Sequence, residues 1–363
     1  MKKSVPFIVV VLLELKKCWG LSGFERNCDY MRESLFISVI IPAYNVESTI
    51  GTLIVNLEMQ RFSSFEIIVI NDGSTDHTQE VISRLSKKYD NITSISQVNM
   101  GVSSARNTGL KSARGQYVLF LDADDSVSTQ LLSVVYQKAK HGNFQDELII
   151  FGKENIDSNG KVVSVNKIPE MESQKLTASM FTLLLDNNLL ATMYNKVVKR
   201  TLIGDNLFQK LSVGEDFQFV LDILEKNPMT SFINKSLYTY ELESVGSIMQ
   251  KYNPDRLTNF VNQKAQMKRI ISDVSNSKAE ELEILSDLNI DTLDRIVTNI
   301  FRKQSDKSLI DQYTELSNAN NEFNTSTPKI VKKYQGVKRV KMFLVVRHNI
   351  LSFLILSILY KIR

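Results

Sequence analysis

Short apolar runs alternate with amphipathic stretches between residues 36 and 151. The apolar runs predict strands at 37–41, 66–70, 92–98, 117–121 and 148–151. Between them, apolar positions recur at helical spacing, which predicts helices at 47–60, 76–89, 102–114 and 128–140. Because the strands are almost continuously apolar, we expect a parallel sheet that is covered on both faces. The alternation of strand and helix therefore predicts a doubly wound α/β domain, in which ligands bind at the carboxyl ends of the strands.

This alternation weakens beyond Gly152. We expect residues 173–227 to be mainly helical, with a short strand at 231–240 and charged, amphipathic helices over 255–316. An Asn-, Ser- and Thr-rich stretch at 318–327 predicts a surface loop or linker. The second half of the chain is thus expected to differ in architecture from the first.

Three polar clusters follow predicted strands directly, at 42–45, 71–76 and 122–125. A single cluster of this kind is common, because turns favour Asn, Asp, Gly and Ser. Three of them at the same edge of a parallel sheet predict a pocket. Within the second cluster, Asp76 is expected to be the N-cap of the following helix, with Gln79 in capping-box position.

The cluster at 122–125 carries the clearest chemistry, with carboxylates at Asp122, Asp124 and Asp125. Carboxylates so close together repel one another unless a counter-charge is present. Mg²⁺ or Mn²⁺ supplies that charge through oxygen ligands, and such ions commonly bridge to phosphates. The alternative is an Asp-rich turn that caps the helix beginning near Ser128. Together with the other two clusters, the pattern favours a metal site.

Composition narrows the class of protein. The two cysteines, Cys18 and Cys28, exclude a disulfide scaffold and a four-ligand structural zinc site, and three histidines leave little room for a His-rich metal centre. The formal net charge is +4, but residues 323–363 hold nine Lys or Arg and no Asp or Glu, so the remainder has a net charge of −5. An acidic body with a basic tail argues against nucleic-acid binding and favours a tail at a membrane surface.

The N-terminus has the outline of a signal peptide, with Lys2 and Lys3 before the apolar run 5–13. Glu14 closes that run, a basic pair follows it, and the run is too short to span a bilayer. Three interpretations stay open: an export signal, a membrane-apposed extension, or a leader upstream of a start at Met31.

The C-terminus contains two apolar stretches, 342–346 and 350–360, which Arg347 interrupts. A helix spanning the bilayer through both would place Arg347 well inside it, at a cost of about 2.5–3.5 kcal/mol. An interfacial position instead lets the basic residues meet anionic lipid. We therefore predict a basic amphipathic tail that binds an anionic membrane surface. The alternative is a C-terminal helix packed on the body.

Four segments together carry a family resemblance. They are VIIPAYN at 39–45, VINDGSTD at 69–76, Gly101 with SARNTG at 104–109, and LDADD at 121–125. In order and spacing they resemble the family 2 glycosyltransferases with the GT-A fold, over about residues 35–150. The resemblance implies an inverting enzyme that uses a nucleotide-diphosphate sugar, often a UDP-sugar.

The resemblance also implies roles for individual residues. Asp72 would accept a hydrogen bond from the imide N–H of uracil or thymine. Arg106 would assist donor binding, with an internal ion pair as the alternative. Asp122 would face the ribose and the metal, Asp124 would bind the metal, and Asp125 would orient its neighbours. The remaining implied contacts to the donor are Pro42, Ala43, Tyr44, Glu47, Gly101 and Ala123.

Residues 213–219, VGEDFQF, resemble the family's acidic motif on the acceptor side. Inverting transfer needs a base that takes the proton of the acceptor hydroxyl. The resemblance gives that role to Asp216, with Glu215 as the second candidate. The alternative is an acidic helix N-terminus that complements the helix dipole. Asn195-Lys196 and the segment 238–247 also resemble family features near the acceptor.

One departure from the family concerns histidine. Some members add a later His to the metal ligands, whereas this chain has no His between His141 and His348. Diphosphate and water would then complete the coordination of the metal.

The resemblance organises the chain into five regions. We expect an N-terminal extension (1–34), a GT-A nucleotide-sugar-binding region (35–150), an acceptor-binding and catalytic-base region (151–250), a helical C-terminal region (251–328) and a basic membrane-associating tail (329–363).

The expected function is transfer of a sugar from a nucleotide-diphosphate sugar to a saccharide or lipid-linked acceptor, as in capsule or exopolysaccharide assembly. The expected location is the cytoplasmic face of the cell membrane, with peripheral attachment. A sugar-phosphate nucleotidyltransferase is an alternative, but it would carry a Gly- and Lys-rich loop where 42–45 stand. A non-catalytic nucleotide-sugar-binding subunit is another alternative, although it would not need the acid at Asp216.

Overall fold

The computed structural model describes residues 35–157, 159–166, 168–241, 252–302, 307–323, 336–347 and 349–361. Residues 1–34 lie outside it, and so do the interpretations of the N-terminus made above.

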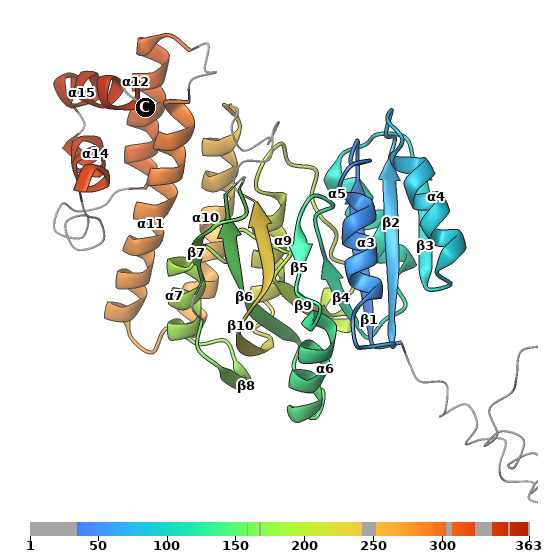
Figure 1. Cartoon of the computed structure of the whole chain (residues 1–363). Helices are drawn as coiled ribbons and strands as arrows, with labels where there is room; N and C mark the ends of the chain where they lie inside the picture. Colours follow the sequence, from blue (N-terminus) through green and yellow to red (C-terminus); the bar gives the residue numbers. More distant parts are fainter. Residues whose placement is uncertain are drawn as a thin grey trace, which may run out of the picture.

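The first part of the chain forms the predicted alternation of strand and helix (Figure 1). Each predicted strand and helix up to residue 151 is present, within a few residues of its expected ends. The strands are β1 (Ile37–Ala43), β2 (Phe65–Asp72), β3 (Ile92–Gln97), β4 (Tyr117–Phe120), β5 (Ser126–Val127) and β6 (Leu148–Ile156); the helices are α3 (Ile50–Glu58), α4 (Thr78–Lys88), α5 (Val102–Ser112) and α6 (Leu131–His141).

The sheet is mixed, which corrects the expectation of a parallel sheet. Its strands follow the order β3-β2-β1-β4-β9-β6-β10-β5, and β3, β2, β1 and β4 are parallel. Strand β9 (Lys196–Lys199) then runs antiparallel to both β4 and β6. Strand β10 (Met229–Glu241), which contains the strand predicted at 231–240, is parallel to β6. The antiparallel strand joins the two halves of the chain in one continuous sheet.

Residues 173–227 are less helical than expected. They contain α7 (Ala178–Asp186), the short α8 (Arg200–Ile203) and α9 (Glu215–Leu224), but also β9 and the end of β8 (Met171–Lys175). Strand β8 pairs with β10, and β7 (Val162–Val165) pairs with β6, so this region widens the sheet rather than only covering it.

Helices cover both faces of the sheet, as the apolar strands predict. On one face the side chains of β1 and β2 pack against α3, α4 and α6. On the other face they pack against α5, together with α7, α9 and α10 (Arg256–Val274). Helix α5 approaches the sheet closely at Gly109, where a Cβ atom would lie 2.4 Å from Cγ2 of Ile40. The alternating residues of β1 therefore serve two cores.

The last part of the chain forms a third core beside the sheet (Figure 1). It is built by α11 (Lys278–Ile300), α12 (Leu309–Glu322), α14 (Gly336–Arg347) and α15 (Ile350–Lys361). Because α12 extends to Glu322, residues 318–322 are helical rather than part of the predicted loop.

The tail packs against the body and also presents an apolar surface. Met342 and Val345 of α14, with Phe353 and Leu356 of α15, are buried against α11 and α12. The opposite side of α15 is exposed at Ile350, Leu351, Leu354, Ile355 and Ile358. Among the described helices, none combines the length and the hydrophobicity that a bilayer crossing requires.

Candidate active site

Strands β1, β2 and β4 end at the same edge of the sheet, at the top of Figure 1. Hydrogen bonds join the first two polar clusters there. The backbone N–H of Asn45 donates to Ser74 Oγ at 3.0 Å, and Asn45 Oδ1 accepts from the N–H of Thr75 at 2.8 Å. The predicted convergence of these loops is therefore present.

Glu47 also connects the two loops. Its carboxylate accepts from the N–H of His77 at 2.7 Å, and its own N–H donates to Asp76 Oδ2 at 3.2 Å. The N-cap of α4 is His77, so the prediction of Asp76 as N-cap was wrong, although Asp76 Oδ1 accepts from the N–H of Thr78. Pro42, Ala43 and an exposed Tyr44 lie beside this connection, at the end of β1.

Asp72 is buried at the end of β2, where its carboxylate is held by three hydrogen bonds. Oδ1 accepts from Gln97 Nε2 at 2.7 Å and from the N–H of Met100 at 3.0 Å, and Oδ2 accepts from the N–H of Gly101 at 2.8 Å. Gly101 has φ +90°, a conformation that favours glycine, and it begins α5. A carboxylate has about four acceptor positions, so one of them is left for a ligand.

Arg106 of α5 connects the acidic clusters of the two halves of the chain. Its guanidinium donates to Asp216 Oδ1 at 2.6 Å and to Asp122 Oδ1 at 3.1 Å, and it lies 3.6 Å from Glu215 Oε1. Only 5% of the Arg106 side chain is exposed, and its guanidinium stacks on Phe208 at 5.2 Å. The internal ion pairs that were left as an alternative are thus present, and they bring Asp122 and Asp216 to one cation.

Asp216 and Glu215 begin α9 directly after Gly214, which has φ +86°. Burial raises the pKa of Asp216 above its usual range; Arg106 acts in the opposite direction, whereas Glu215 and Asp122 add to the rise. With several carboxylates around one guanidinium, the carboxylate of Asp216 has a proton affinity that suits proton exchange near neutral pH.

Asp122, Ala123, Asp124 and Asp125 follow β4. Burial, and then the carboxylate of Asp122, raise the pKa of Asp124 and raise that of Asp125 to about 8. Asp125 accepts a short hydrogen bond from the hydroxyl of Tyr238, and its other oxygen accepts from the N–H of Glu241 at 3.4 Å. Asp125 therefore fixes the loop to β10, which agrees with an orienting role.

Asp122 and Asp124 are the carboxylates that were predicted to bind a metal. Among the described residues, no basic side chain pairs with Asp124, which is exposed and lies near the carboxylate of Asp122. No group of three or more His, Cys, Asp or Glu side chains that could hold a metal occurs in the described ranges. The donor set therefore fits Mg²⁺ or Mn²⁺ bound through two carboxylates and completed by phosphate and water, and does not fit a closed protein cage.

Sequence reasoning missed two residues that complete this edge. Lys153 donates to the hydroxyl of Tyr194 at 2.6 Å, and its Nζ lies 5.1 Å from the ring centroids of both Tyr194 and Tyr240. Tyr194 stacks on Tyr238, with ring centroids 4.2 Å apart. Lys153 lies two positions after the predicted apolar strand 148–151, and this placement could have identified it. Tyr194 precedes strand β9, which was not predicted.

Asn195-Lys196 was expected near the acceptor, and the structure shows a structural role for the pair. Lys196 is buried, and its ammonium donates to the carbonyls of Leu189 and Thr192 at 2.5 Å each and to Asn195 Oδ1 at 3.0 Å. Burial lowers the pKa of Lys196 to about 7. These bonds hold the loop that carries Tyr194.

Known proteins are similar to this chain in sequence and in fold. Residues 38–202 match the family model "Glycosyl transferase family 2". A cholesterol galactosyltransferase of Borreliella burgdorferi is 33% identical over 220 residues, which cover 58% of this chain and 61% of the relative. A poly(ribitol-phosphate) beta-glucosyltransferase of Bacillus spizizenii is 28% identical over 260 residues, 68% of this chain and 38% of the relative. The matches thus span about three fifths or less of these relatives.

The solved structures extend the likeness beyond residue 202. The crystal structure of S. aureus TarS 1–349 in complex with UDP-GlcNAc has a TM-score of 0.63 and 21% identity, and the match covers 90% of this chain and 91% of that one. The shared fold includes the mixed sheet and helices described above. The family model and the relatives thus agree for the matched part of the chain: residues 38–202 belong to glycosyltransferase family 2.

Proposed function

We propose that this protein is an inverting glycosyltransferase that moves a sugar from a UDP-sugar to a saccharide or lipid-linked acceptor during synthesis of a cell-surface polymer. The family supports transfer from a nucleotide sugar. The relatives named above are a galactosyltransferase and a glucosyltransferase, and the structural neighbour is in complex with UDP-GlcNAc. Those names support a UDP-linked hexose or its N-acetyl derivative as donor.

The observation that carries the proposal is the pair of contacts made by Arg106. One cation holds Asp122, at the donor edge of the sheet, and Asp216, which begins α9 in the second half of the chain. A purely binding protein would need the first contact but not a second, partly buried carboxylate with a raised pKa. These contacts support a site in which the donor and the base meet at Arg106.

In the reaction, Asp216 takes the proton of the acceptor hydroxyl as that oxygen attacks C1 of the donor sugar on the face opposite the phosphate. Its raised pKa favours acceptance of the proton near neutral pH. Arg106 keeps the carboxylate aligned and stabilises its charged form. Glu215, 3.6 Å from the same guanidinium, is the second candidate for this role.

The donor side is formed by the loops after β1, β2 and β4. Asp72 offers its remaining acceptor position to the base imide, and Pro42, Ala43, Tyr44, Glu47 and Gly101 surround the nucleotide. Asp122 and Asp124 would hold Mg²⁺ or Mn²⁺. Such an ion supplies neutralisation of the negative charge that develops on the departing diphosphate.

We also propose that α15 rests on an anionic membrane surface. Its exposed side carries Ile350, Leu351 and Ile358, which are more than half exposed. The same C-terminal region holds the nine basic residues and no acidic one. Apolar side chains that enter the interface, with lysines and arginines that meet anionic headgroups, form a peripheral attachment that brings the enzyme to a lipid-linked acceptor.

A screen of donors tests the function. UDP-glucose, UDP-galactose, UDP-GlcNAc and GDP-mannose are each incubated with the full chain and Mn²⁺, and binding and slow donor hydrolysis are measured with and without chelator. We expect a UDP-sugar to bind and to be hydrolysed only with metal, and Asp216→Asn to bind it without turnover. Release of pyrophosphate from a sugar phosphate and UTP would instead indicate a nucleotidyltransferase. Binding with equal, negligible turnover in both proteins would indicate a binding subunit.

A further inference from the structure

Arg256, the first residue of α10, is a buried cation that has no counter-ion among the described residues. Only 6% of the residue is exposed, and its Nε is buried with no hydrogen-bond partner. Within the part of the chain that the structure describes, the guanidinium forms neither a hydrogen bond nor an ion pair. Burying a charge is unfavourable unless an opposite charge or several hydrogen bonds compensate.

Two more cations, Arg295 and Arg302, act on this position, and Arg295 also acts on a third, Lys153. Burial, then Arg302 and Arg295, lower the pKa of Arg256 to about 10. Burial also lowers the pKa of Lys153 to about 8, with Arg295 acting in the same direction and Asp125 against it. Only 9% of Lys153 is exposed. We call these four residues, Lys153, Arg256, Arg295 and Arg302, the basic cluster.

Arg256 lies beside the loop that leads to Asp216. Next to Arg256, Asp255 accepts from Ser212 Oγ at 2.7 Å. One turn further along α10, Asn259 Nδ2 donates to the carbonyl of Val213 at 2.9 Å, and Gln263 donates to the carbonyl of Gly214 at 3.3 Å. The first turns of α10 are therefore fixed to the residues that directly precede the proposed base.

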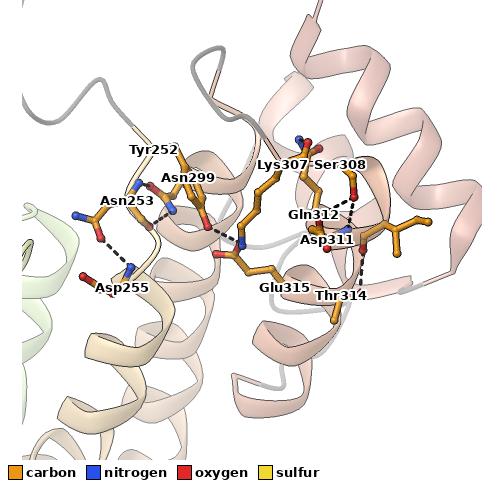
Figure 2. Close-up of polar contacts among 11 residues, drawn as sticks. Tyr252, Asn253, Asp255, Asn299, Lys307, Ser308, Asp311, Gln312, Thr314 and Glu315 are labelled. Atoms are coloured by element: carbon orange, nitrogen blue, oxygen red, sulfur yellow. Dashed lines mark hydrogen bonds and ion pairs between the residues drawn. The ribbon is translucent and has the colours of Figure 1, made fainter.

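The surrounding helices hold this turn in place (Figure 2). The N–H of Asn253 donates to Asn299 Oδ1 at 3.0 Å, and Asn299 Nδ2 donates to the carbonyl of Asn253 at 2.8 Å. Tyr252 donates to Glu315 at 3.0 Å, and Lys307 donates to the same oxygen at 2.6 Å. On the other side, Arg295 donates to Asn188 Oδ1 at 2.8 Å. The cations thus come from elements that polar contacts fix relative to one another.

We propose that the basic cluster binds a phosphate group of the acceptor, next to the hydroxyl that receives the sugar. The proposal rests on the function given above and adds the chemical class of the acceptor. Guanidinium groups bind phosphate through pairs of parallel hydrogen bonds. Several cations offer more donors than the two oxygens of one carboxylate accept, and a phosphate matches them better. Arg256, at the start of α10, lies next to the base-bearing loop, whereas Asp122 and Asp124 lie on the donor side.

The first test measures phosphate binding by the full chain and by Arg256→Met, with Arg269→Met as matched control. Arg269 lies on the same helix but is exposed and paired with Glu225 at 2.7 Å. Inorganic phosphate is titrated at constant ionic strength, and binding is followed by the rise in Tm and by calorimetry. We expect the wild type and Arg269→Met to bind alike and Arg256→Met to lose about tenfold or more in affinity, the effect of a charge-assisted hydrogen bond. Equal phosphate affinity in all three proteins would overturn the proposal.

The stability of the same variants gives a second, independent readout. Since Arg256 has no counter-ion without ligand, Arg256→Met should unfold at the same or a higher temperature than the wild type in phosphate-free buffer. A clear fall in its Tm would mean that Arg256 is a structural residue with a partner inside the folded chain, and would overturn the proposal.

The third measurement separates an acceptor phosphate from the donor diphosphate. We expect wild-type protein loaded with UDP and Mn²⁺ to bind glycerol 3-phosphate at least about tenfold more tightly than glycerol, and Arg256→Met to lose this preference while its UDP affinity stays within about twofold. A parallel loss of UDP affinity would assign the cluster to the donor and overturn the proposal. If no nucleotide sugar binds to the wild type, the proposed function fails, whereas the phosphate titration still decides on the basic cluster.

Discussion

Replacement of Arg106 by Met should destabilise the protein far more than loss of an ordinary surface ion pair. The guanidinium is 2.6 Å from Asp216, 3.1 Å from Asp122 and 3.6 Å from Glu215, and 5% of the side chain is exposed. Removing it leaves three partly buried carboxylates without their cation, for which up to about 3–5 kcal/mol of unfolding free energy is expected to be lost. In a protein of this size, that corresponds to a fall in Tm of roughly 10 °C.

The pH dependence of this loss distinguishes electrostatics from packing. Without the cation, the pKa of Asp216 rises further, so the native state of the variant binds more protons than the unfolded state. Its stability must then decrease as pH increases through the acid range toward neutrality. We therefore expect the stability difference between wild type and Arg106→Met to be larger at pH 8 than at pH 5.

The assay is chemical unfolding at both pH values, with chelator present so that no metal compensates. Arg269→Met is the control, because its exposed pair with Glu225, at 2.7 Å, should be worth at most about 1 kcal/mol at either pH. Arg106→Lys keeps the charge, but a single ammonium group does not reach both carboxylates as the guanidinium does. Its loss of unfolding free energy should lie between those of Arg106→Met and Arg269→Met. A loss below 1 kcal/mol for Arg106→Met at pH 8, or one that is equal at both pH values, would refute the electrostatic reasoning.

Three further predictions address the site and the tail. Asp216→Asn should keep UDP-sugar affinity in calorimetry and lose about 10²–10⁴-fold in turnover, so loss of donor binding with normal residual turnover would contradict its role as base. Asp124→Ala should lose metal-dependent donor binding. Its Tm should stay within a few degrees of the wild type, because the residue lies in a loop. Full activity of the wild type in excess chelator would contradict the metal site. The double change Leu351→Glu/Ile358→Glu should abolish flotation of the protein with anionic liposomes, whereas the control Ile310→Glu, at an exposed position of α12, should not. Binding of the wild type that does not depend on lipid charge would contradict an interfacial tail.

Local pattern predicted the first half of the fold because each element there carries its own signal. Strands β1 and β2 are buried along nearly their whole length, so their sequences are apolar regardless of register. Strand β9 lacks such a signal. It has four residues with lysine at both ends, and its position depends on pairing with β4 and β6, which lie far away in the sequence. The change from a parallel to a mixed sheet was therefore not visible locally.

The tail also could not be predicted completely from local pattern. Its apolar residues predicted one amphipathic surface, but the sequence did not show that some of them pack in a core while others are exposed. Met342 and Phe353 are buried in the third core, whereas Ile350 and Leu351 are exposed. Truncation of the tail would thus expose a core as well as remove the proposed membrane contact, which is why point changes on α15 test the attachment more cleanly.

The site residues were predicted from motifs, whereas the charges that control them were not. Arg106 was expected at the donor, yet its partners lie 16 and 110 positions away, and only the fold shows that one guanidinium serves both. Arg256 has no motif at all, since an arginine at the start of a charged helix usually lies in solvent. Burial strengthens the electrostatic effect of both guanidinium groups, but the two differ in what compensates their charge. Arg106 satisfies carboxylates that the fold itself supplies, whereas Arg256, with no carboxylate of the described chain paired to it, leaves its charge to be satisfied by a bound anion.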